Sequence, residues 1–119
     1  MSMQTKDRVL LNKILDEIEV IETVQQTIGE NAFFADKVRQ HAVVMALLNS
    51  GELARNLDEK TRRLAPEIPW MQVIGLRNVA AHGYASLSMT DIWKTVVDDV
   101  PQLKASIKRL LAEGSGRQP

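Results

Sequence analysis

Apolar residues recur every three or four positions along most of this chain, and that spacing constrains its fold more than any other feature. The clearest stripe predicts a helix over about 5–28, ended by Gly29, and consists of Leu10, Ile14, Ile18, Ile21, Val24 and Ile28. A second stripe consists of Phe34, Val38, His41, Met45, Leu48, Leu53 and Leu57. It predicts a long helix that is capped by Asn31 or Asp36, bends at Gly51 and reaches about residue 64.

Two prolines then interrupt the helical spacing, because Pro66 and Pro69 disfavour helix at and before their own positions. A third helix is predicted over 70–81, ending before Gly83, with Met71, Ile74 and Val79 among its apolar positions. Ser88 or Thr90 is a suitable cap for a fourth helix. Its buried stripe is expected to consist of Ile92, Val96, Val100, Leu103, Ile107 and Leu110, and Pro101 should kink it or divide it.

These elements predict an all-α fold, an up-and-down bundle of four to five helices with short loops. No strand-period alternation and no internal repeat stands out in the sequence. A chain of 119 residues can bury a core without disulfides or metals. We expect a single helical domain over 1–113 and a disordered tail over 114–119.

The composition excludes several classes of function. The chain has no cysteine, which rules out disulfides, thiolate metal sites and a cysteine nucleophile. The sequence has no apolar run of signal-peptide or membrane-spanning character, so we expect a cytoplasmic protein with no membrane partner. Fifteen basic residues balance fifteen acidic residues, so any contact with nucleic acid must be local rather than a general attraction to polyanions.

The segment from Arg77 to Tyr84 carries most of the chemistry, because it combines a fixed cation, an amide, an imidazole and the only tyrosine of the chain. Asn78 and His82 are four residues apart and can touch on a helix. Arg77 and His82 are about 140° apart around a regular helix, so they would converge best where the helix frays. Gly83 permits such a departure.

This set of side chains suits cleavage of RNA without a metal ion or other cofactor. Arginine binds phosphate through paired hydrogen bonds, and histidine exchanges protons near neutral pH. Cleavage needs a base for the 2′-hydroxyl, an acid for the leaving 5′-oxygen and a cation for the phosphate. One histidine cannot easily be both base and acid, so a homodimer with two copies of the segment in one cleft is a chemical expectation.

The same residues also have plain structural readings. Spacing alone leaves His82 more often a helix-end or core residue than a catalyst, and Arg77 more often a solvated surface residue. Glu52 has two equally good interpretations. It can orient Arg77 across the bundle, or it can be a partly exposed residue beside Arg55.

A family resemblance favours the functional reading. Arg77, His82 and Tyr84 match the Arg-x4-His-x-Tyr motif of the HepT family, the toxin half of HepT–MntA toxin–antitoxin modules within the HEPN superfamily. The resemblance covers most of 7–111. Besides the motif it includes the segments Asp7–Leu11, Gln40–Val43, Gly51–Leu53, Pro66–Trp70, Ile74–Asn78, Asp91–Thr95 and Asp99–Leu103.

The resemblance implies a metal-independent endoribonuclease toxin of a type VII-like module that works as a homodimer. Arg77 and His82 would be the catalytic pair, supported by Asn78 and Glu52. Tyr84 would accept AMP from an MntA-like minimal nucleotidyltransferase antitoxin. A bulky anion there would occupy the space and charge that an RNA phosphate uses. The alternative is a non-catalytic nucleotide-binding or regulatory subunit of a nucleotidyltransferase.

Overall fold

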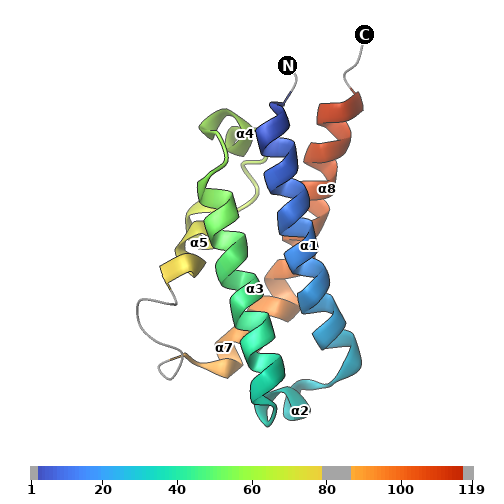
Figure 1. Cartoon of the computed structure of the whole chain (residues 1–119), viewed down its shortest axis with the longest axis vertical. Helices are drawn as coiled ribbons and strands as arrows, with labels where there is room; N and C mark the ends of the chain where they lie inside the picture. Colours follow the sequence, from blue (N-terminus) through green and yellow to red (C-terminus); the bar gives the residue numbers. More distant parts are fainter. Residues whose placement is uncertain (1–2, 79–86, 117–119) are drawn as a thin grey trace.

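Three long helical rods form the body of the protein, as the computed structural model in Figure 1 shows. The structure describes residues 3–78 and 87–116, and within them every regular element is helical, which confirms the all-α class. α1 (Thr5–Thr27) packs along α3 (Lys37–Arg55), and α8 (Val100–Gly116) packs against α1. α1 begins and α8 ends at the same end of the bundle.

Short elements connect these rods. They are α2 (Glu30–Phe34), α4 (Glu59–Arg63), α5 (Trp70–Gly75), the 3-10 turn η1 (Leu76–Asn78), α7 (Met89–Lys94) and the π turn η3 (Thr95–Asp99). The described part of the chain therefore holds more elements than the expected four to five helices. Two of them, α2 and α4, lie where a single long helix was expected to begin and end.

The apolar stripe of α1 is buried as predicted. Ile14, Ile18, Ile21 and Val24 are buried, and together with Phe33, Val96 and Ile107 they form the core between the rods. The stripe on the last helix is confirmed in the same way, since Ile92, Val96, Val100, Ile107 and Leu110 are buried and Leu103 packs against the same core. Burial of such side chains is the main stabilising contribution to a helical bundle of this size.

The expected distortion near Pro101 is a π turn. Pro101 has no N–H to donate to the carbonyl one turn earlier, and its ring crowds that carbonyl. The chain responds by widening over Thr95–Asp99, and the Val100 N–H bonds to the Thr95 carbonyl, five residues back. The helix then continues to Gly116, beyond the expected domain end at residue 113. The rest of the expected tail, 117–119, lies outside the described residues.

The prediction for the second helix was wrong about which face is buried. Val38 and Met45 are 79% and 54% exposed, and Phe34 and His41 are also exposed. The face that packs on the bundle instead consists of Gln40, Val43, Val44, Ala46, Leu47, Ser50, Gly51 and Ala54. Both faces of α3 are apolar, so periodicity alone could not choose between them. The polar members of the buried face are satisfied locally, with Gln40 donating to the Phe33 and Phe34 carbonyls.

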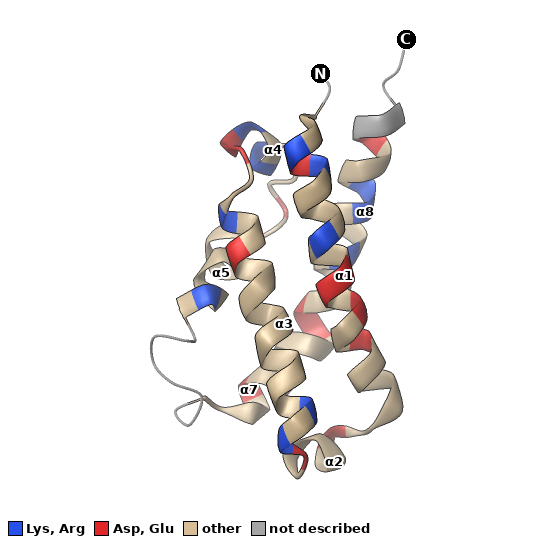
Figure 2. Cartoon of the chain, viewed as in Figure 1, with Lys and Arg blue, Asp and Glu red and all other residues tan. Residues whose placement is uncertain are grey.

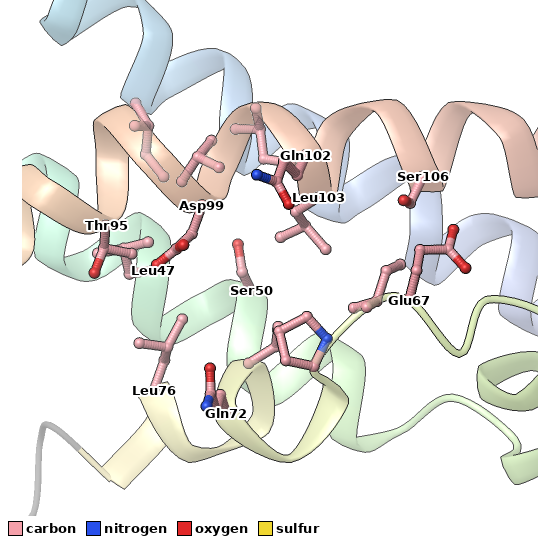
Figure 3. Close-up of a pocket in the computed structure, with 16 residues that line it drawn as sticks. Leu47, Ser50, Glu67, Gln72, Leu76, Thr95, Asp99, Gln102, Leu103 and Ser106 are labelled. Carbon is pink, nitrogen blue, oxygen red and sulfur yellow. The ribbon is translucent and has the colours of Figure 1, made fainter.

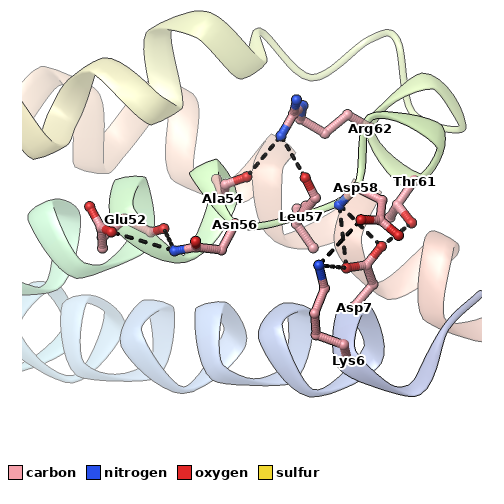
Figure 4. A network of polar contacts seen from close by, with 9 residues as sticks. All are labelled: Lys6, Asp7, Glu52, Ala54, Asn56, Leu57, Asp58, Thr61 and Arg62. Atoms are coloured by element: carbon pink, nitrogen blue, oxygen red, sulfur yellow. Dashed lines mark hydrogen bonds and ion pairs between the residues drawn. The ribbon is translucent and has the colours of Figure 1, made fainter.

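The second helix also ends earlier than predicted, at Arg55 rather than near residue 64. The junction between α3 and α4 is held by a polar network (Figure 4), in which Arg62 donates to the Ala54 and Leu57 carbonyls. Asp7 of α1 is fully buried and accepts from the Asp58 N–H at 3.3 Å and from the Thr61 hydroxyl. Asp7 thus stabilises the start of α4 from another helix, because it accepts from the N–H of the N-cap residue Asp58, as the acidic side chain of a capping box does.

Two helices begin at predicted cap residues. Asp36 accepts from the Arg39 N–H at 3.0 Å at the start of α3, and Ser88 accepts from the Asp91 N–H at 3.2 Å at the start of α7. Met71 was expected at an apolar packing position and is 80% exposed. α5 buries Trp70 and Val73 instead, and Met71 lies about 100° around the helix from Trp70.

Candidate active site around Arg77 and Glu52

The centre of the candidate site is an ion pair between η1 and α3. The Arg77 Nε donates to a Glu52 carboxylate oxygen at 2.9 Å, and both side chains are partly exposed. This contact joins residues 25 positions apart, as one of the two interpretations of Glu52 predicted. The other interpretation also holds, because Arg55 donates to the second carboxylate oxygen at 3.3 Å.

The Glu52 carboxylate remains charged in this setting. Desolvation by itself would raise its pKa, but the hydrogen bond from Arg77 and the charges of Arg55 and Arg77 outweigh that effect and lower the pKa. An ionised Glu52 holds Arg77 through Nε, which leaves the two terminal nitrogens of the guanidinium without a hydrogen bond or ion pair to any other described residue. Those two nitrogens are the pair that binds a phosphate with parallel hydrogen bonds.

Gly51 brings η1 close enough to α3 for this contact. A Cβ on Gly51 would lie 2.7 Å from the Val73 carbonyl oxygen and 2.9 Å from the Arg77 nitrogen. Backbone atoms cannot yield as the end of a flexible side chain can, so only glycine fits here without movement. A bend was predicted at Gly51, but α3 runs through this position as regular helix, and the glycine instead allows the close approach of η1.

The helix that carries the expected motif changes character just before it. The third helix was predicted over 70–81, but α-helical geometry ends at Gly75 and Leu76–Asn78 form a 3-10 turn. Arg77 therefore lies on a tighter turn than an α-helix, and Asn78 is exposed at its end. His82 and Tyr84 fall within 79–86, outside the described residues, so their arrangement with Arg77 stays a prediction.

The described arginines outside this site have local partners. Arg62 is bound to backbone carbonyls at the end of α3, and Arg63 pairs with Glu59 within α4. Lys104 pairs with Glu22 of α1 at 2.8 Å. Figure 2 shows that the middle of α3 carries no charge, in accord with the absence of Asp, Glu, Lys and Arg from 40–51.

Metal-binding clusters and membrane-spanning helices are both absent from the residues that the structure describes. Among them, no group of three or more His, Cys, Asp or Glu side chains is placed to hold a metal ion. Over the same ranges, 3–78 and 87–116, no helix combines the length and apolar character that crossing a bilayer requires.

Comparison with known proteins gives one family. The family model for ribonuclease HepT-like proteins matches residues 14–110. A protein of Thermococcus cleftensis named "Probable ribonuclease HepT" is 35% identical over 108 residues, which cover 91% of this chain and 98% of the relative. A candidate RNase of Methanocaldococcus jannaschii is 31% identical, with 85% and 93% of the two chains covered. A candidate RNase of Caldanaerobacter subterraneus is 30% identical, with 87% and 93% covered.

The comparison with solved structures gives no match. The family assignment therefore depends on sequence, and it covers nearly the whole of the chain and of its relatives. The all-helical fold agrees with it. The chain belongs to the HepT-like ribonuclease family.

Proposed function

We propose that this protein is an endoribonuclease toxin that cleaves RNA without a metal ion, with Arg77 and His82 as the catalytic pair. The observation that carries the proposal is the Glu52–Arg77 ion pair, which holds a partly exposed guanidinium whose terminal nitrogens make no hydrogen bond or ion pair to any other described residue. In the proposed reaction Arg77 binds the phosphate, and histidines take a proton from the 2′-hydroxyl and give one to the leaving 5′-oxygen. Asn78, exposed at the end of η1, would position the phosphate or His82.

The first test is RNA cleavage by the purified protein in EDTA. We expect His82→Ala to abolish cleavage while the circular dichroism spectrum and melting temperature stay unchanged. Cleavage that survives in this variant would refute the assigned mechanism. Cleavage that EDTA prevents would refute the metal-independent part alone.

Glu52 is proposed as the residue that positions Arg77, and Glu52→Gln tests it. The amide keeps the size of the side chain and can still accept one hydrogen bond, but it loses the charge that fixes the guanidinium. We expect a lower rate of RNA cleavage and little change in melting temperature, because the side chain is 47% exposed. Gln72→Ala, a change at an exposed residue of α5, is the control and should cleave at the wild-type rate.

A homodimer is part of the proposal, because two histidines would then share one cleft. The face of α3 that carries Val38 and Met45 supports it, since both large apolar side chains are exposed and Met45 lies in the uncharged stretch 40–51. Light scattering should give a dimer for the wild type and a monomer for Met45→Glu. Lys60→Glu, on exposed α4, should stay dimeric. A wild-type monomer that cleaves RNA would refute the shared cleft.

Regulation by AMP transfer to Tyr84 is proposed from the family motif. Incubation with a minimal nucleotidyltransferase partner and ATP should add mass in AMP units, and the addition should be absent from Tyr84→Phe. If ATP binds while RNA is never cleaved, the alternative of a nucleotide-binding or regulatory subunit takes the place of the toxin.

A further inference from the structure

A cavity of about 230 Å³ lies between α1, α3, α5 and the η3–α8 segment. Its walls are mainly aliphatic, and Figure 3 shows side chains from α3, α5 and α8 surrounding it. The apolar lining includes Ile18, Ile21, Leu47, Val73, Val100 and Leu103. Gln72, Asp99 and Gln102 line its rim and are exposed, so the cavity opens to the surface. An apolar pocket with a few polar groups is the usual form of a small-ligand site.

Three hydroxyl groups line this cavity; Ser106 hydrogen-bonds with Glu67, and the other two donate to backbone carbonyls. Ser50 is buried, its hydroxyl donates to the Ala46 carbonyl at 2.8 Å, and its side chain points into the cavity in Figure 3. Thr95 donates in the same way to the Asp91 carbonyl at 3.0 Å. Both oxygens therefore retain only accepting capacity toward an occupant. A ligand can therefore bond to these two hydroxyls only as a hydrogen-bond donor.

Of the two carboxylates that line the cavity, one is paired with a cation and the other, among the described residues, is not. Glu67 is paired with Arg109 at 2.7 Å, so its charge is already compensated. The Asp99 carboxylate has no hydrogen bond or ion pair to any residue in the described ranges, although Asp99 lies at the end of the π turn and lines the cavity. π turns inside helices are common at functional sites. The unbalanced charge at the rim is therefore negative and favours a cationic group.

We propose that this cavity binds a small organic amine, with an apolar body among the aliphatic side chains and a primary ammonium group at Asp99. Cavities of about 150 Å³ lined by aliphatic side chains accept benzene, so this larger one has room for an aromatic ring with a short alkyl chain. The site is separate from the proposed RNA cleavage, although Leu76 lines the cavity and is followed directly by Arg77 in η1.

Phenethylammonium is a suitable probe, and 2-phenylethanol is its uncharged control of nearly the same shape. Methyl signals of Leu47, Leu76 and Leu103 would be followed by NMR during titration of the full-length protein. We expect saturable shifts at all three with the amine and a dissociation constant about tenfold higher for the alcohol, as suits one charge-assisted hydrogen bond. No saturable shift with either probe overturns the proposal. Equal binding of the two overturns the role of the charge.

Two variants locate the ammonium group. Asp99→Asn should weaken amine binding to the level of the alcohol, whereas Asp98→Asn, an exposed neighbour in the same π turn, should leave it unchanged. Equal loss in both would mean that general surface charge attracts the amine, which overturns the site. Leu103→Phe fills the cavity and should abolish the shifts of Leu47 and Leu76. Shifts that persist in that variant would place amine binding outside the cavity and would also overturn the proposal.

Discussion

Gly51 and Gly75 provide a matched pair for testing how η1 is held against α3. Gly51 lies inside α3 and Gly75 is the last residue of α5, so replacement by alanine gains helix propensity, up to about 1 kcal/mol in a helix interior. At Gly75 an added Cβ meets nothing within 4 Å. Gly75→Ala should therefore stabilise the protein by about 0.5–1 kcal/mol, because the gain is not offset by crowding.

At Gly51 the same methyl group would lie 2.7 Å from the Val73 carbonyl oxygen and 2.9 Å from the Arg77 nitrogen. Overpacking of this kind costs about 1–3 kcal/mol, and the rigid backbone partners favour the upper part of that range. After the gain in propensity is subtracted, Gly51→Ala should lose about 2 kcal/mol, a fall in melting temperature of about 8 °C at roughly 4 °C per kcal/mol.

Thermal unfolding followed by circular dichroism gives both values, at one protein concentration because association would raise the melting temperature. The two substitutions should differ in sign. If Gly51→Ala proves as stable as Gly75→Ala, then η1 does not approach α3 as closely as the structure shows. The account of how Arg77 is held would then be wrong.

Three further predictions concern the core, the buried acid and the response to pH. Ile14→Ala empties a fully buried position and should cost about 2–5 kcal/mol in denaturant unfolding, whereas a smaller loss would mean that the core closes around the gap. Asp7→Ala should cost about 1–3 kcal/mol, because it leaves the Thr61 hydroxyl and the start of α4 without their acceptor. The pKa of Asp36 is lowered from 3.8, chiefly by the backbone hydrogen bond from Arg39. Its contribution to stability is therefore complete above pH 3.8 and is lost as the pH falls through the lower folded value. Asp36→Asn should make the loss of stability in acid shallower, and an unchanged acid limb would contradict this.

The sequence predicted α1 and the last helix well because each has one apolar face. In α1 the stripe of Ile14, Ile18 and Ile21 is flanked by charged residues, so only one orientation buries apolar surface. The same holds for Val96 and Ile107 near the other end of the chain. Where the pattern is unambiguous, periodicity decides which face is buried before any tertiary contact is known.

α3 shows where that reasoning fails. Its uncharged segment 40–51 has apolar residues around the whole helix, so burial depends on what the neighbouring helices offer. The buried face includes Gln40 and Ser50. Burial of these polar side chains is tolerated because nearby backbone carbonyls accept hydrogen bonds from them. That information is tertiary, and so is the early end of α3, which depends on Asp7 from α1 and Arg62 from α4.

The candidate site was predictable in part. The contact between Glu52 and Arg77 was one of two interpretations of Glu52, and the structure contains both that contact and the one to Arg55. The role of Gly51 was missed, because a glycine in a helical pattern signals a bend as readily as a close approach. The order of residues held a signal, because Gly51 directly precedes Glu52. Among the described side chains, Glu52 is the only hydrogen-bond partner of Arg77.

Gly51 and Glu52 act on η1 in different ways because they are neighbours on one helix. Successive residues point about 100° apart, so the bare surface of Gly51 meets the η1 backbone while the Glu52 side chain reaches around it to the guanidinium. The glycine sets how near the turn lies, and the carboxylate sets where the arginine points. A longer side chain at position 51 would move the Arg77 backbone away, and a neutral side chain at position 52 would leave the backbone in place and free the guanidinium. The close approach is therefore a property of the fold, whereas the orientation of the charge is a property of the site, and the two can be changed independently.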